Sequence, residues 1–313
     1  MSDEKDLNVV FGAGGGLGSA VVRVLAAKGK RVRAVNRSGR LDLPGNVEAF
    51  EADAANAGSV RAACEGASVV FNCANAPYTN WPELLPSIFR GILNGAASAG
   101  AKLIIGDNLY CYGLVDGEIT EDLPYAATGI KGALRGHLAT EMMEAHEVGK
   151  VRLAIGRASD FFGPYSFAGA GDLVFKAALL GKKAKALGNV DMPHTWTYTE
   201  DFAKGLIKLS EEERALGEVW HIPSAETVTT REFINMVFQE VGDAPKIQAV
   251  PGWLVSIMGV FNPMMRELKE MMYEWEEPYI VSHSKYENAF GNESTPHREA
   301  IRSTLDWFRF RLK

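Results

Sequence analysis

The feature that most constrains the fold is a run of glycines close to the N-terminus, directly after a short apolar segment. Val9-Val10-Phe11 leads into Gly12-Ala13-Gly14-Gly15-Gly16-Leu17-Gly18, and a helical pattern over residues 17–28 follows. Glycine permits a tight turn and lets backbone N–H groups come close to a bound group, while the N-terminus of the following helix attracts negative charge. The strand, turn and helix therefore predict a cradle for a phosphate-bearing ligand.

Short β-branched runs alternate with longer helical patterns through the first half of the chain. The expected strands are 7–11, 31–35, 47–51, 68–72, 102–106 and 151–155, and the expected helices are 17–28, 59–65, 81–99 and 131–148. This rhythm is typical of right-handed crossovers that build a parallel sheet with helices on both faces. We predict the α/β class, with a doubly wound parallel Rossmann sheet and a smaller, interleaved C-terminal domain.

The second half is less regular. We expect helices over 172–180, over 199–210 with Thr199 as N-cap, and from Thr229 to residue 241 with Glu232 completing a capping box. The segment 253–272 is rich in methionine and large apolar residues but carries several charges. It predicts a buried or lid helix pair, with a membrane-surface role as the alternative. We predict a dinucleotide-binding domain over 1–165, to which 196–224 returns, and a substrate domain formed by 166–195 and 225–313.

Composition excludes several classes of function. The formal net charge is −6 without a basic run, which argues against a nucleic-acid surface. The N-terminus starts with acidic residues and its first apolar run is short, so we expect neither a signal peptide nor a membrane span. The three cysteines, at 64, 73 and 111, show no metal-ligand spacing. They indicate reduced thiols in a cytoplasmic protein without a metal site.

The end of the second expected strand bears on the choice between NAD and NADP. NAD-binding domains usually place an acidic residue there, which binds the ribose 2′-hydroxyl. Here Asn36 takes that place, and Arg37 and Arg40 follow. Guanidinium groups suit a 2′-phosphate, so NADP(H) is favoured over NAD(H); the alternative is that both arginines are solvated loop charges. Asp53 follows the third strand and suits either the adenine amino group or a helix cap.

Several motifs occur in one order over nearly the whole chain: the Gly12–Gly18 loop, Asp53, Asn72-Cys73-Ala74, Tyr112-Gly113, Phe162-Gly163-Pro164, Tyr198-Thr199-Glu200-Asp201-Phe202-Ala203 and Ser284-Lys285. In these the sequence resembles the extended short-chain dehydrogenase/reductase family, which includes NAD-dependent epimerases and dehydratases. The resemblance implies a Rossmann sheet for the cofactor and a C-terminal domain for a small-molecule substrate. The residues expected to contact the cofactor are Gly12, Gly14, Gly15, Gly16, Leu17, Gly18, Asn36, Arg37, Arg40, Asp53, Ala54, Cys73, Ala74 and Lys131.

The sequence departs from this family at the catalytic positions. The family uses a Ser or Thr and a Tyr-x-x-x-Lys, but Asn108 stands in the first place and the tyrosine is missing from the helix that contains Lys131. Lys131 also resembles the lysine of the isoflavone-reductase-like branch, which works without that tyrosine. A desolvated lysine could donate a proton directly or through water; alternatively it touches only the ribose, and Tyr110, Tyr112 or Tyr125 supplies the phenol.

The substrate positions depart from the family as well. Nucleotide-sugar members hold a diphosphate with Asn and Arg where this sequence has Asp160 and His194, a poor pair for an anion. Aromatic side chains nearby suit an apolar ligand. The residues expected to contact substrate are Trp81, Asp107, Asp160, Phe161, Phe162, His194 and Trp196, with Tyr165 in the same aromatic wall.

These expectations converge on an NADPH-dependent reductase of a small, fairly hydrophobic carbonyl or enone. The alternatives are an epimerase or other isomerase that retains its cofactor, and a non-catalytic NADP(H)-sensing regulatory protein. If the chain forms a homodimer, the helices 81–99 and 131–148 would pair across the two-fold axis, as the family's dimer helices do.

Overall fold

Seven parallel strands form the central sheet of the computed structural model, which describes residues 7–42 and 44–312. The acidic first residues of the N-terminus, on which the expectation about a signal peptide rests, lie outside that part. The strand order is β12-β7-β5-β4-β1-β2-β3, and every neighbouring pair is parallel. The strands are β1 (Leu7–Phe11), β2 (Arg31–Asn36), β3 (Val47–Glu51), β4 (Ala67–Asn72), β5 (Lys102–Asp107), β7 (Leu153–Arg157) and β12 (Val219–His221). The predicted doubly wound Rossmann sheet is confirmed.

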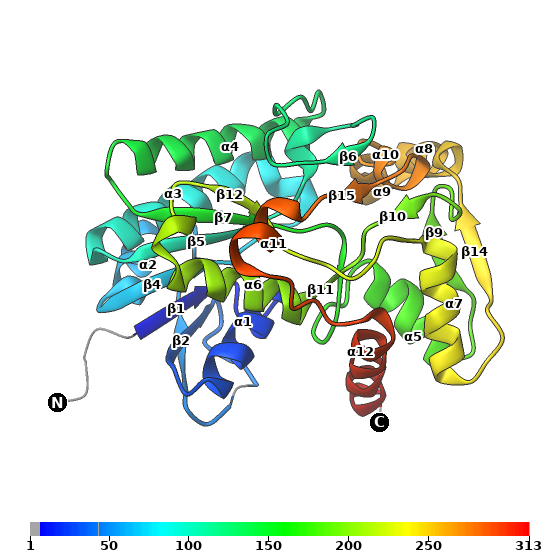
Figure 1. The fold of residues 1–313 in the computed structure, drawn as a ribbon, viewed down its shortest axis with the longest axis horizontal. Coiled ribbons are helices and arrows are strands. Elements are labelled where there is room, and N and C mark those ends of the chain that lie inside the picture. Colours follow the sequence, from blue (N-terminus) through cyan, green and yellow to red (C-terminus); the bar gives the residue numbers. More distant parts are fainter. Residues whose placement is uncertain (1–6, 43, 313) are drawn as a thin grey trace.

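Helices cover both faces of this sheet, and each face has its own apolar core (Figure 1). On one face lie α1 (Gly16–Ala27) and α6 (Thr199–Glu211), which pack against each other. On the other lie α2 (Ala57–Cys64), α3 (Trp81–Ala99) and α4 (Ile130–Glu147). The strands β1 and β7 are buried over their whole length, as expected of strands covered on both sides.

Most helix ends follow the local chemistry that predicted them. Thr229 caps α7 (Thr230–Val241) in a full capping box with Glu232, as expected. After α4 the chain turns at Gly149, which has a φ of 75° that glycine adopts without strain. The predicted cap of α6 is wrong. Tyr198 takes the N-cap position, and Thr199 is the first helical residue, since the chain enters the helix directly from strand β11.

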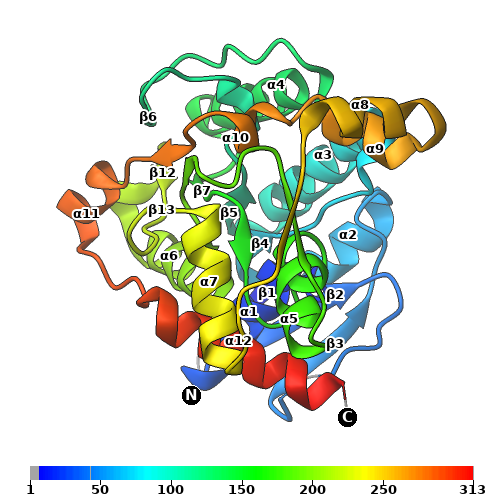
Figure 2. The same ribbon diagram turned by 90° about the vertical axis from the view of Figure 1, so that its right-hand side faces the viewer.

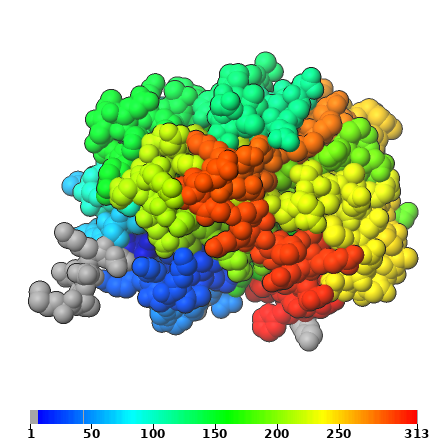
Figure 3. Space-filling model, viewed as in Figure 1, coloured from blue at the N-terminus to red at the C-terminus, as the bar shows by residue number. Residues whose placement is uncertain are grey.

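A second group of elements surrounds an apolar core of its own. Its members are β8 (Phe161–Phe162), a π-helical turn over Gly171–Phe175, α5 (Lys176–Leu179), β9 (Ala184–Leu187), β10 (Pro193–His194), β11 (Thr197–Tyr198), β13 (Val228–Thr229), β14 (Ile247–Val250) and α12 (His297–Arg311), together with α7. The short elements β6 (Glu118–Ile119), α10 (Tyr273–Glu276), β15 (Ile280–Val281) and α11 (Ser284–Phe290) link this group to the sheet. Figure 3 shows the chain around α11 crossing one face of the molecule between the sheet layer and α7. The boundary at residue 165 stays a prediction.

The segment 253–272 forms a helix pair, α8 (Gly252–Phe261) and α9 (Pro263–Lys269), at one end of the molecule (Figure 2). The expected helix pair is confirmed, but its expected burial is wrong for these helices: only Gly252, Val255 and Gly259 of α8 are buried, no residue of α9 is, and Phe261 is 87% exposed. The hydrophobicity of this segment misled the prediction because its largest side chains point outward. Within the described residues, no helix is long and apolar enough to cross a membrane.

Candidate functional site

The glycine-rich turn between β1 and α1 has the shape that a dinucleotide phosphate cradle requires. Gly12 has a φ of 77°, and a Cβ there would overlap with the carbonyl oxygen of Cys73. A Cβ on Gly18 would overlap with the carbonyl of Gly12, so both positions accept only glycine. The amide of Gly15 donates to the Gly12 carbonyl at 3.0 Å and closes the turn. The N-terminus of α1 then faces the space above the turn, where it favours a phosphate group.

The segment around Ser166 also borders the space above the turn, and the sequence did not predict this contact. The Cβ of Ser166 lies 3.2 Å from where a Cβ on Gly16 would stand, so the segment after β8 closes over the start of α1. Tyr165 is the only non-glycine residue of the described chain with a positive φ, 63°, and its ring packs at a tilt against Trp307, with centroids 4.8 Å apart. The Gly163-Pro164 turn was the signal that could have found this approach.

The residues expected at the adenosine end lie beside the same turn. The Asn36 side chain accepts from the Ser38 amide at 3.2 Å and donates to the carbonyl of Arg40 at 3.0 Å, which holds the loop after β2 in place. Arg37 and Arg40 are exposed, and within the described chain neither has a carboxylate partner. Asp53 does not cap α2, because Asn56 does so through the amide of Ser59.

The other residues expected near the cofactor line the edge of the sheet. Leu17 is buried under the turn against Gly106, and the carbonyl of Cys73 packs on Gly12. The Ala74 amide is fixed by the side chain of Asn72 at 3.1 Å. Ala54 follows Asp53, and its carbonyl packs against α3 at Gly91. These positions put backbone next to the glycine turn, which fits a nicotinamide dinucleotide.

Lys131 stands at the start of α4 and is only 2% exposed. Its ammonium contacts the carboxylates of Glu267 and Glu270, the latter at 3.5 Å. The Lys131 amide also donates to Glu270 at 2.6 Å, so this carboxylate caps the N-terminus of α4 from another part of the chain. A Cβ on Gly129 would overlap with Glu270, so the helix pair α8–α9 is packed tightly onto the start of α4.

Two tyrosines lie beside this lysine. The hydroxyls of Tyr78 and Tyr110 are 2.7 Å apart, and the Lys131 ammonium is 5.8 Å from the centre of the Tyr78 ring. Burial raises the pKa of Tyr78 to about 12, against the lowering effect of its bond to Tyr110. Burial, and then the nearby Glu274, raise the pKa of Tyr110 well above its usual value. Both phenols are therefore protonated at neutral pH.

A buried ionic network occupies the carboxyl ends of β5, β7 and β12. Asp107 accepts from Arg135 at 3.1 Å and from Arg157 at 3.2 Å. Arg157 also donates to the hydroxyls of Tyr112 at 2.8 Å and Tyr125 at 3.0 Å. Asp107, expected at the substrate, is thus fully engaged within the protein, and the Tyr112 and Tyr125 hydroxyls are engaged as well.

The network ends in a neutral histidine. The Tyr112 hydroxyl lies 3.0 Å from His221 Nε2, and His221 Nδ1 lies 3.2 Å from the carbonyl of Ser282. Since a carbonyl only accepts, Nδ1 carries the proton and Nε2 accepts from Tyr112. Burial, and then the charge of Arg157, lower the pKa of His221 to about 3. Asn108, next to Asp107, accepts from the amide of Tyr110 at 3.3 Å and shapes the turn that carries this tyrosine.

Asp160 and His194, both expected to contact the substrate, do come together. His194 Nε2 is 3.2 Å from the Asp160 carboxylate, and Trp275 donates to the same carboxylate at 3.0 Å. Trp196 packs on the ring of His194, with centroids 4.8 Å apart.

The predicted aromatic wall is wrong as a single surface. Trp81 stacks with Tyr110 on the sheet side, whereas Phe162 and Trp196 both pack on Phe233 in the separate core of the second group. Phe161, the neighbour of Phe162, is 40% exposed, because successive strand residues point to opposite sides. The apolar content of the sequence did not reveal which core each ring joins.

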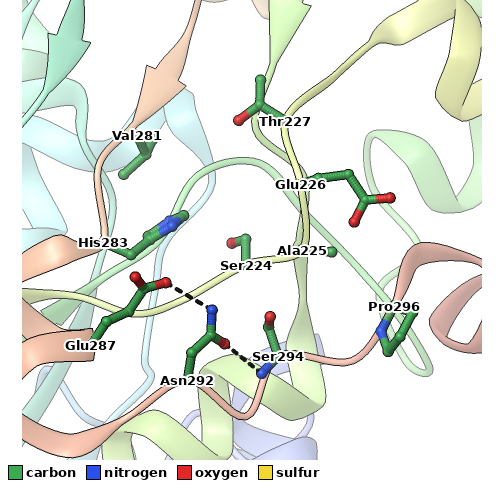
Figure 4. Close-up of a pocket in the computed structure, with 10 residues that line it drawn as sticks. All are labelled: Ser224, Ala225, Glu226, Thr227, Val281, His283, Glu287, Asn292, Ser294 and Pro296. Carbon is green, nitrogen blue, oxygen red and sulfur yellow. Dashed lines mark hydrogen bonds between the residues drawn. The ribbon is translucent and has the colours of Figure 1, made fainter.

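A cavity of about 340 Å³ lies between residues 224–227 and the chain over residues 281–296 (Figure 4). It is lined by Ser224, Ala225, Glu226, Thr227, Val281, His283, Glu287, Asn292, Ser294 and Pro296. Burial lowers the pKa of His283 to about 4. A cavity of about 430 Å³ lies between α1, α6 and α11. None of the residues predicted for the site lines either cavity. Within the described residues, no group of three or more His, Cys, Asp or Glu side chains is arranged to hold a metal.

The model of the NAD-dependent epimerase/dehydratase family matches residues 8–222, which is most of the chain and includes the glycine turn, Lys131 and the buried network. The chain belongs to this family. Its members are nicotinamide-nucleotide-dependent oxidoreductases, epimerases and dehydratases of the extended short-chain dehydrogenase/reductase type, so the predicted class of enzyme is confirmed. Binding of a nicotinamide nucleotide follows from membership and from the fit of the turn.

The individual proteins that resemble this chain share only a modest part of its sequence. The chain is 36% identical over 120 residues to cinnamoyl-CoA reductase 1 of Oryza sativa subsp. japonica, a match that spans 34% of this chain and only 35% of that protein. It is 25% identical over 294 residues to 2-alkyl-3-oxoalkanoate reductase of Shewanella oneidensis, which covers 87% of this chain and 75% of the relative. The structure of UDP-glucose 4-epimerase of Thermus thermophilus with NAD superimposes with a TM-score of 0.78 at 19% identity, over 97% of this chain and 99% of the other. That likeness concerns the fold.

Four acidic or phenolic residues of this region were missed by the site prediction: Tyr78, Glu267, Glu270 and Glu274. Glu267, Glu270 and Glu274 recur at helical spacing within a segment rich in methionine and large apolar residues. That spacing was the signal that could have found them, because charges in such a segment need partners.

Proposed function

We propose that the protein reduces a small, fairly hydrophobic carbonyl compound or enone at the expense of NADPH. The observation that carries this proposal is the buried Lys131 ammonium beside the Tyr78–Tyr110 pair, at the edge of the sheet where this fold binds its ligands. The two relatives found by sequence, cinnamoyl-CoA reductase 1 and 2-alkyl-3-oxoalkanoate reductase, are reductases named for carbonyl-containing substrates, which supports this choice of reaction.

When bound, the cofactor supplies a hydride to the carbonyl carbon. The protein must then deliver one proton to the oxygen, and Lys131 is the proposed donor, directly or through a water molecule. Glu267 and Glu270 contact the ammonium and fix its position. Tyr110, bonded to Tyr78, is the alternative donor, and Asn108 positions it by bonding its amide.

With one exception, the proposed substrate contacts are those expected from the sequence. Asp160 and His194 present one carboxylate and one imidazole where nucleotide-sugar members hold a diphosphate, so a doubly charged phosphate ester would be repelled. Trp81, Phe161, Phe162 and Trp196 complete the proposed set, whereas Asp107 is left out because both of its oxygens pair with arginines. The split of the aromatic residues between two cores means that the substrate would lie between them rather than against one wall.

The proposed cofactor is NADP(H), because Arg37 and Arg40 follow β2 without carboxylate partners in the described chain. Two guanidinium groups next to Asn36 suit a 2′-phosphate. Asp53 is proposed to bind the adenine amino group.

The test follows NADPH absorbance with a panel of apolar ketones, aldehydes, enones and 3-oxo esters. Lys131→Ala is expected to lower kcat at least about 100-fold, the scale of a lost general acid. Lys150→Ala, which removes an exposed lysine after the same helix, is the matched control and should leave turnover unchanged. Turnover that survives Lys131→Ala would move the donor role to Tyr110.

Two other outcomes would replace the reductase proposal. Tight cofactor binding with substrate isomerisation and no NADPH consumption would indicate an epimerase, which the family also contains. Cofactor binding without any turnover would indicate a sensing protein. We also propose that the protein is a cytoplasmic homodimer in which α3 and α4 pair with their counterparts. Light scattering of the purified protein measures the molecular mass and so tests whether it is a dimer.

A further inference from the structure

Three segments that are far apart in the sequence meet beside the proposed substrate site. Ser159 and Asp160 follow β7, His194 and Trp196 come from β10 and the residues after it, and Glu274 comes from α10. His194 Nδ1 donates to the backbone carbonyl of Glu274 at 3.1 Å. Together with the Asp160–His194 contact, this bond ties all three segments together.

These three connected segments carry buried polar atoms without hydrogen-bond partners. These atoms are Ser159 Oγ, His194 Nε2, Trp196 Nε1 and Glu274 Oε2. His194 Nε2 lies 3.2 Å from the Asp160 carboxylate, but its orientation does not make a hydrogen bond. Nearly all buried polar atoms in proteins are hydrogen-bonded, because leaving one unpaired sacrifices its hydration without replacement. Four such atoms on three adjoining segments therefore indicate a place where an external polar group binds.

Glu274 is the most unusual member of this group. Its side chain is 1% exposed, and the Tyr279 hydroxyl donates to one of its oxygens at 3.3 Å, while the other oxygen has no partner. Burial, and then repulsion from the nearby Asp160, raise the pKa of Glu274 well above its ordinary value. The carboxyl group is thus held neutral and can donate a hydrogen bond.

Glu274 also lies near the proposed reaction centre. Its chain neighbours Tyr273 and Trp275 pack against the apolar cluster that contains Tyr110 and against which Tyr78 also packs. Tyr78 and Tyr110 are the two tyrosines next to Lys131. A group that binds at Glu274 would therefore belong to the same molecule whose carbonyl faces Lys131.

We propose that the Glu274 carboxyl group binds an uncharged oxygen of the substrate, such as an ester, ketone or hydroxyl oxygen, and makes the site discriminate against anionic substrates. This proposal rests on the reductase function proposed above. The indole N–H of Trp196 and the hydroxyl of Ser159 are further unpartnered donors on the adjoining segments. An anionic group here would face the carboxylate of Asp160, and no described cation pairs with that carboxylate except His194 when protonated.

The experiment compares two substrates that differ by one charge, methyl 3-oxodecanoate and the 3-oxodecanoate anion, with NADPH. The wild-type protein is expected to prefer the ester at least about 30-fold in kcat/KM, because the anion meets a carboxylate without a compensating cation. Glu274→Leu should lower kcat/KM for the ester about 10-fold and that for the anion little, because one hydrogen bond to a neutral partner is lost. Glu274→Gln keeps a neutral donor and should retain the preference within about 3-fold.

Glu277→Leu, at an exposed glutamate three residues on, is the matched control and should leave the ratio of the two substrates unchanged. A merely structural role of Glu274 would lower both rates together and leave that ratio intact. An ester preference that is the same in wild-type protein and in Glu274→Leu would overturn the proposal.

A binding measurement separates this proposal from the reductase proposal. Titration calorimetry follows the binding of methyl 3-hydroxydecanoate to the protein in the presence of NADPH, because NADPH cannot reduce this alcohol and no hydride can pass between the two. Affinity about 10-fold weaker in Glu274→Leu than in wild type supports the role of Glu274 even if neither 3-oxo compound is reduced. Equal affinity in both proteins, or no binding to the wild type, would overturn it.

Discussion

The substitution Asp107→Asn tests whether the buried network is what holds the carboxyl ends of the strands together. Arg135 and Arg157 are almost completely buried, and Asp107 is the only carboxylate of the described chain within ion-pair distance of either. The asparagine side chain has the same shape but removes the charge. It also turns one acceptor into an N–H donor that faces a guanidinium N–H.

The size of the effect follows from these contacts. Removing one partner of a buried ion pair costs about 3–5 kcal/mol, because the other charge is left without compensation. Here two guanidiniums lose that partner, although the hydroxyls of Tyr112 and Tyr125 still accept from Arg157. We therefore expect a loss of about 4 kcal/mol out of a total stability of roughly 5–15 kcal/mol.

Urea unfolding followed by circular dichroism measures this loss. With an m-value of about 3 kcal/mol per M, the midpoint should fall by roughly 1.3 M. Glu141→Gln is the control, since it breaks the exposed, two-bonded pair of Glu141 with Arg90 and should cost at most about 1 kcal/mol. The double variant Asp107→Asn/Arg157→Gln should regain part of the loss. A midpoint for Asp107→Asn no lower than that of the control would refute the reasoning.

Three further perturbations have defined outcomes. Gly18→Ala places a Cβ against the Gly12 carbonyl, so NADPH affinity measured by fluorescence titration should fall at least about 10-fold; unchanged affinity would mean that the turn is not the cradle. Arg37→Ala and Arg40→Ala together should weaken NADPH binding about 10–100-fold and leave NADH binding within about 3-fold, if they hold the 2′-phosphate; equal loss for both cofactors would contradict that role. The lowered pKa of His221, about 3 in the folded protein, means that protonation favours the unfolded chain below an ordinary pKa of about 6.5. Stability should thus be full above a pH of about 6.5 and fall by about 2.5 kcal/mol on going to a pH of about 4.5, and His221→Gln should flatten this part of a urea-midpoint profile; an equally steep fall in that variant would assign it to other groups.

The sheet could be predicted from sequence because each of its strands carries its own signal. Val9–Phe11 and the glycines after it combine an apolar run with a turn that only glycine can make. The helix over Trp81–Ala99 was placed with both ends correct, since Pro82 starts it and Gly100, with a φ of 68°, ends it. Turns and helix ends of this kind depend on residues that are close together in the sequence, so they can be predicted without knowledge of tertiary contacts.

The contacts within the site could not be predicted in this way. Lys131 and Asn108 were selected because of a family resemblance. The residues near Lys131 in the sequence do not indicate that its partners are Glu267 and Glu270, which lie more than a hundred residues later. Asp107 was expected at the substrate because of its place at a strand end. The same place also faces the ends of β7 and of α4, which bring Arg157 and Arg135 to it. Which neighbour a strand-end carboxylate meets is decided by tertiary packing.

Glu267 and Glu270, the partners of Lys131, connect the proposed proton donor to the helix pair α8–α9. Glu270 caps the start of α4 through the Lys131 amide and, with Glu267, pairs with its ammonium, so the α8–α9 pair is anchored to the proposed reaction centre by charges. No residue of α9 is buried, and hence apolar packing contributes little to holding that helix in place. Any ligand that competes for the ammonium of Lys131 would weaken this anchor and shift the helix pair. The position of α8–α9 should therefore respond to what is bound at Lys131, whereas the sheet beneath it, which is held by buried strands, should not.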